Sequence, residues 1–361
     1  MPEADLRDLG AIPNTAGVYV IRGREGSPHL GRTAVLRRRL QRLAQVLKLE
    51  DSGAVVEYYP TGSAFESMVA LYRLARRCRR EDYRNFLRLR APVFLKLNLT
   101  NPYPRVFLTR RLGRDRAVYF GPFTTRAAAE RFENAFLDLF LIRRCKPEIL
   151  PDPAHPGCIY GEMSMCLRPC QGRATEEEYR AETGRVAEFL NSRGQSLVRE
   201  IESARDQASE ALEFEAAAKW HRRLEKTREA LDSNEEMARD VDRLYGVVVQ
   251  RSAEAGAVEL WFLYQGSLQA RRRLVVTQEA AGTVSLDQRL RELVAQMEFR
   301  KRPSRERAEV LGLLVRWWSS SWKTGELILF DGLDQVPYRR LVRAVSRNAR
   351  SGGHDEGPAK N

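Results

Sequence analysis

The stretch CKPEILPDPAHPGCIYGEMSMCLRPC, residues 145–170, decides how the rest of this 361-residue chain is organised. It holds four of the chain's five cysteines, and prolines stand at positions 147, 151, 153, 156 and 169. Each proline removes a backbone donor and fixes φ, so the stretch cannot form a helix or a central strand. We therefore expect a metal bound by four thiolates, those of Cys145, Cys158, Cys166 and Cys170, to hold the segment in shape.

Two other interpretations of the cysteines stay open. Buried structural thiols rarely gather in a proline-rich loop, and two disulfides require an oxidising compartment. The N-terminal residues Met-Pro-Glu-Ala-Asp do not form a secretory signal, so we expect a cytoplasmic protein with reduced thiols. Structural zinc sites favour Cys-x2-Cys spacing. No gap here is two residues, so the spacing favours an iron–sulfur cluster, with Zn²⁺ as the alternative.

The charge balance points to a polyanionic partner. Lys and Arg number 61 against 48 Asp and Glu, which gives a net charge of +13. An excess of this kind most often serves nucleic-acid binding, although a generally solvated basic surface is the simpler alternative. No apolar run approaches the length of a membrane span, so we expect no membrane association.

The N-terminal region alternates short strands and helices. A strand is predicted from Gly17, a helix over 35–47, and a second strand over 54–59. The pattern Ser63-x-x-Glu66 predicts a capping box that opens a further helix.

This region resembles a GIY-YIG nuclease domain, and specifically the N-terminal domain of the UvrC family. The resemblance rests on Gly17-Val18-Tyr19, His29-Leu30-Gly31 and the basic run Leu36-Arg37-Arg38-Arg39-Leu40. It continues through Tyr119-Phe120-Gly121-Pro122-Phe123 and Ile142-Arg143-Arg144-Cys145 into the cysteine quartet. In that family the quartet is associated with an iron–sulfur cluster, so the resemblance implies a [4Fe-4S] centre here.

The resemblance implies a catalytic site with departures at His29 and Leu71, and also at Leu43 and Phe94, where a tyrosine and an asparagine are usual in the family. Tyr19 and Arg39 match the first tyrosine and the catalytic arginine, and His29 replaces the second tyrosine as a general base. The family's metal-binding glutamate falls at Leu71, and leucine offers no ligand to Mg²⁺ or Mn²⁺. Glu66 lies five residues earlier and points about 140° away on a helix. The other arginines, Arg32, Arg37 and Arg38, are expected to grip DNA phosphates.

A helical hairpin is predicted after the cysteines. Apolar residues recur at three and four residues from Leu197 to Leu212 and again from Trp220 to Leu231. The junction resembles the UVR motif, by which UvrC contacts the UvrB helicase subunit; packing within the chain is the simpler interpretation of the stripes. The residues expected to bind this partner are Glu213, Phe214, Glu215, Ala217 and Ala218.

The fold class expected is α+β, in five segments. These are a GIY-YIG-like domain (1–95), a connector with the four-cysteine site (96–172), a helical region with the UVR motif (173–237), a small α+β domain (238–347) and a disordered tail (348–361). No RNase H-like second nuclease is expected.

Two functions follow from these expectations. The first is a DNA-binding protein of nucleotide excision repair that cuts DNA beside lesions, working with UvrA and UvrB. The second is an adaptor or regulator that uses the same DNA and UvrB surfaces without cutting. The missing carboxylate at Leu71 is the feature that separates them.

Overall fold

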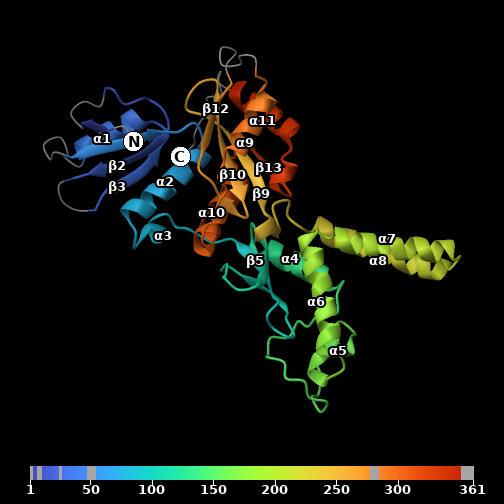
Figure 1. The fold of residues 1–361 in the computed structure, drawn as a ribbon. Coiled ribbons are helices and arrows are strands. Elements are labelled where there is room, and N and C mark those ends of the chain that lie inside the picture. Colours follow the sequence, from blue (N-terminus) through green and yellow to red (C-terminus); the bar gives the residue numbers. More distant parts are fainter. Residues whose placement is uncertain (1–2, 6–9, 24–26, 47–53, 277–283, 351–361) are drawn as a thin grey trace. The chain divides into compact units, whose positions relative to one another are not determined.

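The computed structural model describes residues 3–5, 10–23, 27–46, 54–276 and 284–350, drawn in Figure 1. The chain forms two compact units. The first consists of Met1–Arg90, Tyr245–Lys301 and Arg316–Asn361, and the second of Ala91–Leu244 and Arg302–Val315. The described residues form three small antiparallel sheets, so the predicted α+β class is confirmed. The finer division into five segments stays a prediction.

The first unit begins with a sheet in the order β1-β4-β2-β3. Its strands are β1 (Glu3–Asp5), β2 (Gly17–Arg22), β3 (His29–Thr33) and β4 (Val55–Pro60). Helix α1 (Leu36–Val46) buries Leu36 and Leu40 in a core shared with Tyr19 and Ile21. The strand and helix predictions in this region are confirmed within one or two residues.

Helix α2 (Ala64–Cys78) follows β4, and the short α3 (Tyr83–Phe86) comes after it. Ser63 is the N-cap of α2, and its hydroxyl accepts a bond from the backbone N–H of Glu66 at 3.1 Å. The Glu66 carboxylate accepts from the N–H of Gly62 at 2.8 Å, one residue before the cap. The predicted capping box is therefore only half formed, because the glutamate bonds beyond the cap residue.

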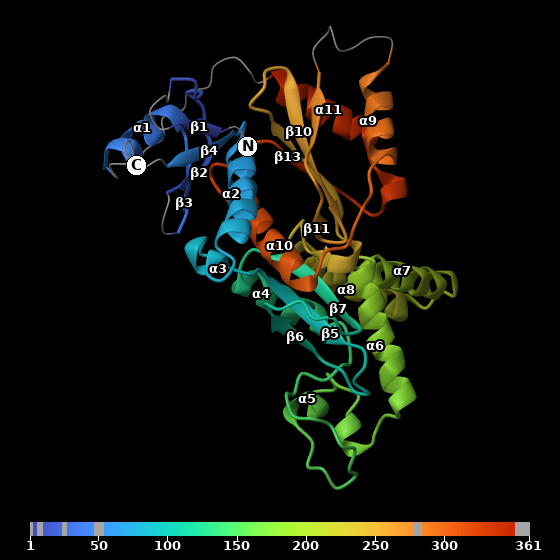
Figure 2. The same ribbon diagram turned by 60° about the vertical axis from the view of Figure 1, so that its left-hand side comes forward.

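The other sheet of the first unit has the order β11-β10-β9-β13, and β12 also pairs with β10. The strands are β9 (Tyr245–Arg251), β10 (Ala257–Tyr264), β11 (Ser267–Leu268), β12 (Arg272–Val275) and β13 (Glu326–Phe330). Gln265 and Gly266 both have positive φ, as a two-residue hairpin turn between β10 and β11 requires. Figure 2 shows α9 (Leu286–Ala295) and α11 (Tyr338–Arg350) on the same side of this sheet.

An aromatic cluster joins the two sheets of the first unit. The Phe65 ring, on α2, lies 5.3 Å from the Trp261 ring and 5.1 Å from the Trp317 ring, measured between centroids. Trp317 belongs to α10 (Ser304–Trp318). The backbone of Gly62 packs so tightly that a Cβ there would lie 2.1 Å from the carbonyl carbon of Ser252. The N-terminal helix α2 is thus built into the C-terminal sheet's core.

The second unit has a sheet in the order β6-β5-β7-β8. Its strands are β5 (Val93–Asn98), β6 (Val106–Thr109), β7 (Ala117–Phe123) and β8 (Arg239–Asp240). Its longer helices, apart from α10, are α4 (Arg126–Leu137), α6 (Glu176–Asn191), α7 (Gln195–Glu210) and α8 (Phe214–Asp232). Stacked phenylalanines, among them Phe120, Phe132 and Phe136, fill the core between β7 and α4.

Two predictions concern the helical hairpin and the C-terminal residues. The predicted hairpin is confirmed as α7 and α8, with Leu197, Ile201 and Leu224 buried along it. The predicted disordered tail is wrong at its start, because Asn348 to Arg350 complete helix α11. Burial of Leu341, Ala344 and Val345 at helical spacing extends α11 to this point. Residues 351–361 lie outside the described part of the chain.

Candidate functional site

The three predicted catalytic residues lie together in the first unit. Tyr19 on β2 pairs with Gly31 on β3, and the rings of Tyr19 and His29 stack with centroids 6.1 Å apart. The Nε of Arg39, on α1, donates to the Tyr19 hydroxyl at 3.4 Å. A Cβ at Gly31 would lie 2.4 Å from that hydroxyl, so this position requires glycine. The strand pair and the following helix bring the three side chains together.

Their exposure differs sharply. Tyr19 is only 2% exposed and packs in the core beneath α1, whereas His29 and Arg39 are exposed. Burial lowers the pKa of His29, and the positive charges of Arg39 and Arg79 lower it further. The imidazole is therefore neutral near pH 7 and able to accept a proton. His29 thus supplies a group that can accept a proton, as the general base of a nuclease does, whereas the neighbouring Tyr19 side chain is buried in the core.

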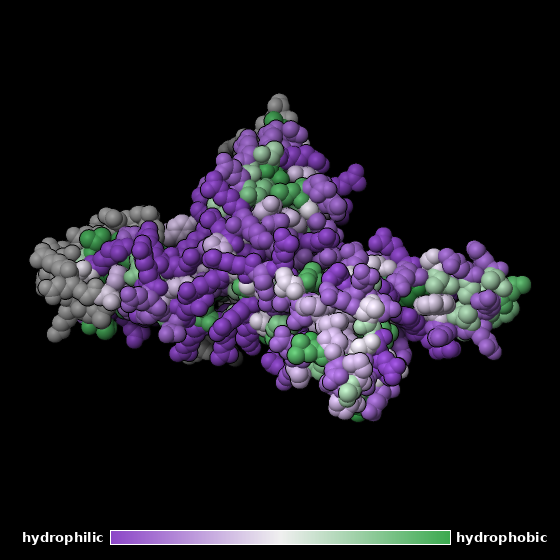
Figure 3. Space-filling view, turned by 60° about the horizontal axis from the view of Figure 1, so that its bottom comes forward, coloured by the Kyte–Doolittle hydropathy of each residue, from purple (hydrophilic) through white to green (hydrophobic). Residues whose placement is uncertain are grey.

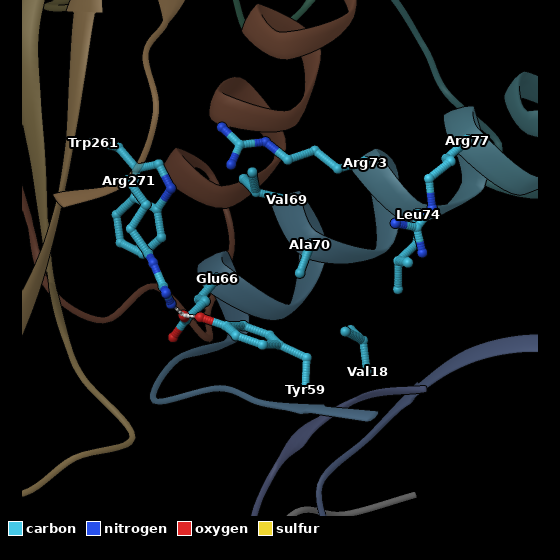
Figure 4. Close-up of a pocket in the computed structure, with 10 residues that line it drawn as sticks. All are labelled: Val18, Tyr59, Glu66, Val69, Ala70, Arg73, Leu74, Arg77, Trp261 and Arg271. Atoms are coloured by element: carbon cyan, nitrogen blue, oxygen red, sulfur yellow. Dashed lines mark hydrogen bonds and ion pairs between the residues drawn. The ribbon is translucent and has the colours of Figure 1, made fainter. Parts of the chain in front are cut away.

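No carboxylate joins this group at the position that the resemblance predicts. Leu71 lies half-buried on α2. Glu66, one and a half turns earlier, is 3% exposed and is held by other groups. Its Oε1 accepts from the Tyr59 hydroxyl at 2.9 Å and from the Arg271 guanidinium at 2.5 Å, and its Oε2 from Gly62. Figure 4 shows Tyr59 and Arg271 directed at this carboxyl.

Glu66 forms part of a buried ion-pair network. Burial raises the pKa of Glu66 to about 7, while the Gly62 bond opposes the rise; Glu259 raises the pKa and Arg273 lowers it. Arg271 bridges Glu66 and Glu259, with 3.2 Å between its Nε and the Glu259 Oε2. Arg273 donates to the other oxygen of Glu259 at 2.8 Å. Glu66 is therefore a structural link between α2 and strands β10 and β12.

A pocket of about 350 Å³ lies beside Glu66 in the first unit. Its apolar wall consists of Val18, Val69, Ala70 and Leu74. Three guanidinium groups, those of Arg73, Arg77 and Arg271, also line it (Figure 4). Arg73 donates to the Gln269 carbonyl at 3.2 Å and Arg77 to Glu57 at 3.4 Å. The predicted catalytic residues do not line this pocket, whose chemistry suits binding of an anion more than proton transfer.

The arginines predicted to grip phosphates lie on β3 and α1. Arg32 and Arg38 are exposed. The Nε of Arg37 donates to the Ile12 carbonyl at 2.7 Å, which ties this side chain to the loop before β2. Arg32 and Arg38 thus present their charge to solvent, whereas Arg37 also has a structural role.

The four predicted metal-binding cysteines lie in the second unit, in a segment with little regular structure. Cys158 precedes the single-turn helix α5 (Ile159–Glu162), and Cys170 lies in a 3₁₀ turn (Pro169–Gln171). All four thiols are free. Burial raises the pKa of Cys166, the backbone hydrogen bond from Arg168 lowers it, and the charges of Cys145, Cys158 and Cys170 raise it.

The four thiols are a suitable set of metal ligands, but they are not arranged as a metal site in the structure. Four thiols near one another are the ligands that both zinc and iron–sulfur centres take. No group of three or more His, Cys, Asp or Glu side chains among the described residues has metal-binding geometry. The metal and the arrangement of its ligands therefore both remain predictions.

Arg143 holds the start of this segment, which the sequence did not reveal. It is 4% exposed, and its guanidinium donates to the Tyr103 carbonyl at 2.7 Å and the Pro147 carbonyl at 2.5 Å. Its backbone N–H donates to the Tyr179 hydroxyl. Side-chain hydrogen bonds thus replace the backbone pairing that the prolines remove, so a metal is not the only means of ordering this segment.

The tip of the α7–α8 hairpin exposes apolar side chains. Leu212 is 70% exposed, in a left-handed conformation, and Phe214 is 69% exposed at the first position of α8. Figure 3 shows apolar residues (green) at this end of the hairpin. Glu213 and Glu215 flank Phe214 and are exposed, while Ala217 is half-buried and Ala218 exposed. Most of the predicted partner-binding residues are therefore accessible from solvent.

Comparisons with known proteins show similarity to UvrC proteins. Residues 93–189 match the family model described as the UvrC/Cho excinuclease middle domain. The UvrABC system protein C of Methanothermobacter thermautotrophicus is 26% identical over 95% of this chain and 59% of its own length. This chain is similar to UvrC proteins over most of its length. The corresponding protein of Acetivibrio thermocellus is 24% identical over 95% of this chain and 57% of its own length.

A third UvrC relative, from Desulforudis audaxviator, is 31% identical over 61% of this chain. The chain spans about three fifths of the length of the first two relatives, which have the longer matches. No solved structure matches it at a significant level. The similarity to the first two relatives covers 95% of this chain, so it is not confined to the region that the family model matches.

Among the described residues, no helix is both long and apolar enough to cross a membrane.

Proposed function

We propose that this chain is a cytoplasmic adaptor of nucleotide excision repair that binds DNA and a UvrB-like helicase subunit without cutting the DNA. The observation that carries the proposal is that Glu66, the first acidic residue of α2, already has a structural role in the folded chain. Glu66 is buried between Tyr59, Gly62 and Arg271, and Leu71 stands where the family's metal ligand is expected. Among the described residues, no carboxylate stands at the family's metal-ligand position, so a divalent metal lacks that anchor beside Tyr19 and His29.

DNA binding is supported by charge. The chain carries +13 in total, and Arg32, Arg38 and Arg39 are exposed on neighbouring elements. Phosphate contacts from such residues give affinity that falls with salt and does not depend on sequence. These residues bind the backbone in the proposal, and His29 lies beside them without a metal-bound water to deprotonate.

Partner binding is supported by the hairpin tip. Exposed Leu212 and Phe214 at the end of two packed helices form a small apolar surface with acidic neighbours, Glu213 and Glu215. An aromatic anchor surrounded by polar residues is typical of a protein–protein hot spot. In the proposal this surface binds the UvrB-like subunit, which in turn works with UvrA.

The four cysteines have a structural role in the proposal. When bound, a [4Fe-4S] cluster, or Zn²⁺ as the alternative, would supply a fixed cross-link between the chain on either side of α5. Cys145, Cys158, Cys166 and Cys170 would hold it. The hydrogen bonds of Arg143 to the Tyr103 and Pro147 carbonyls orient the first of these cysteines independently of any metal.

A second candidate function is a metal-dependent endonuclease. It is favoured by one observation, the neutral and exposed imidazole of His29 next to Tyr19 and Arg39. In that case Mg²⁺ or Mn²⁺ would need a ligand other than Leu71. Arg39 would stabilise the charge on the phosphate and His29 would accept the proton of the attacking water.

One gel experiment separates the two candidates. The chain is incubated with UvrA, UvrB, Mg²⁺ and a labelled duplex containing one lesion, and both the bound complex and the nicked strand are resolved. We expect a complex that contains this chain and no nick above the level without it. A nick that disappears in His29→Ala would establish the nuclease, and absence of any complex would overturn both candidates.

A further inference from the structure

Helix α11 presents a row of arginines that the proposed function leaves unused. The helix sequence, YRRLVRAVSRNAR, contains five arginines and no acidic residue. All five are exposed, and they are Arg339, Arg340, Arg343, Arg347 and Arg350. The opposite side of the helix, with Leu341, Ala344 and Val345, is buried in the core of the C-terminal sheet.

The spacing of these arginines places them on one face. At about 100° per residue, positions 339, 350, 343, 347 and 340 fall within an arc of about 100°. From Arg339 to Arg350 the row is about 16 Å long, and residues four apart are about 6 Å apart along the axis. We call these five residues the α11 row.

Among the described residues, little negative charge is paired with the row. Within the part of the chain that the structure describes, Arg347 is the member with an ion pair, to Glu326 at 2.6 Å. The adjacent helix α9 contributes Asp287, which pairs with Arg291, and that guanidinium lies over the Tyr338 ring at 4.1 Å. Four guanidinium groups of the row therefore face solvent together, which costs electrostatic energy unless an anion binds.

We propose that the α11 row binds the phosphate backbone of duplex DNA. This inference rests on the proposed function, since it assigns a second DNA-contacting surface to the same protein. A straight row of like charges about 16 Å long suits a regular array of phosphates. All five cations are arginines, whose planar guanidinium pairs with phosphate through two parallel hydrogen bonds. An acidic protein would not need this regular spacing.

The row contacts only phosphates and carries no sequence information. It holds the C-terminal sheet domain on the duplex while the arginines of β3 and α1 contact the backbone separately. Each phosphate that the row neutralises releases a counterion and adds about 0.9 to the slope of log K against log salt concentration.

The test measures this slope by fluorescence anisotropy between 50 and 200 mM KCl, with the full chain and a labelled duplex. The variant is Arg339→Ala/Arg343→Ala/Arg350→Ala, which keeps a strong helix former at each exposed position. We expect its slope to fall by about 2 to 3 and its affinity to fall on the order of a hundredfold at 0.1 M salt. Circular dichroism at 222 nm establishes that α11 still folds.

A matched control removes the same charge elsewhere. Lys219, Arg222 and Lys226 are exposed on α8, and their replacement by Ala also lowers the net charge by three. We expect this control to keep the slope of the unchanged chain within about 0.5. An equal fall in both variants would reduce the effect to net charge, and an unchanged slope in both would remove the row from the interface; either result overturns the inference.

Two further outcomes distinguish failure of the inference from failure of the proposed function. If the unchanged chain shows no salt-dependent DNA binding, the proposed function fails, and the inference fails with it. If the α11 variant binds duplex like the unchanged chain but no longer binds polyglutamate, the row serves an acidic protein partner and the inference is overturned while the proposed function stands.

Discussion

Two helices of this protein carry the same dipeptide, Phe-Glu, in their first turn and use it in opposite ways. In α2, Phe65 is 1% exposed between Trp261 and Trp317, and Glu66 is ion-paired to Arg271. At the start of α8, Phe214 is 69% exposed, and Glu215 is exposed. The first pair joins two sheets of one unit, and the second faces solvent at a hairpin tip.

The difference shows how local sequence leaves the role of a residue undecided. Both glutamates favour a helix start, because a negative charge there complements the helix dipole. Only the contacts from distant segments, above all Arg271 to Glu66, turn one of the two dipeptides into structure. The exposed dipeptide of α8, Phe214-Glu215, is available to a partner. The buried dipeptide of α2, Phe65-Glu66, is not available to a metal. The following predictions test this contrast, from the largest effect to the smallest.

Phe65→Ala should lower the free energy of unfolding by about 3–5 kcal/mol, because it leaves a cavity between two buried tryptophans. Phe214→Ala should change it by less than about 0.5 kcal/mol. Urea titration followed by tryptophan fluorescence reports both values, since Trp261 and Trp317 flank Phe65. Equal changes in the free energy of unfolding for the two variants would contradict the different roles of Phe65 and Phe214.

Glu66→Ala should lower the free energy of unfolding by about 3 kcal/mol, because it leaves Arg271 without one of its carboxylate partners in a buried network. Glu215→Ala, the matched change in α8, should have an effect near zero. The same urea titration measures both. A stable Glu66→Ala protein would show that this carboxyl is free for another role.

Phe214→Ala should weaken binding to a UvrB-like subunit at least tenfold, since a central aromatic anchor typically contributes more than 1 kcal/mol. Surface plasmon resonance with immobilised UvrB measures the Kd, and Leu150→Ala is the control because Leu150 is 80% exposed away from the hairpin. Unchanged affinity of Phe214→Ala would place the partner surface elsewhere.

His29 should give a small dependence of stability on pH. Its pKa is lowered in the folded protein, so the unfolded chain takes up a proton first as pH falls below about 6.5. The stability present above pH 6.5 is thus progressively lost on acidification. Comparing Tm between pH 5 and 8, we expect His29→Gln to lose less Tm below pH 6.5 than the unchanged chain. Parallel pH profiles for the two proteins would refute this contribution.

The sequence predicts much of the local structure because local signals are sufficient for it. The glycine and tyrosine pattern on β2 and β3, with the basic helix that follows, brings Tyr19, His29 and Arg39 together as expected. The spacing of apolar residues gave the α7–α8 hairpin. The four cysteines are free thiols, and their segment has little regular structure, as its prolines indicated.

The contacts between distant segments could not be predicted. Arg271 lies 205 residues from Glu66, and no pattern in either segment indicates that they meet. Arg143 was hidden for a similar reason, because its acceptors are backbone carbonyls that any residue could supply. Helix α11 did carry a signal, the spacing of Leu341, Ala344 and Val345, which the high arginine content obscured.

The proposal that no acidic group among the described residues is a ligand for a catalytic metal near His29 is most directly tested by Mn²⁺ binding, measured by electron paramagnetic resonance with the full chain. The account predicts no stoichiometric Mn²⁺ site at millimolar metal that depends on His29 or Glu66. One bound Mn²⁺ per chain that is lost in Glu66→Gln would contradict it, because that carboxyl would then be a metal ligand and not a structural ion pair.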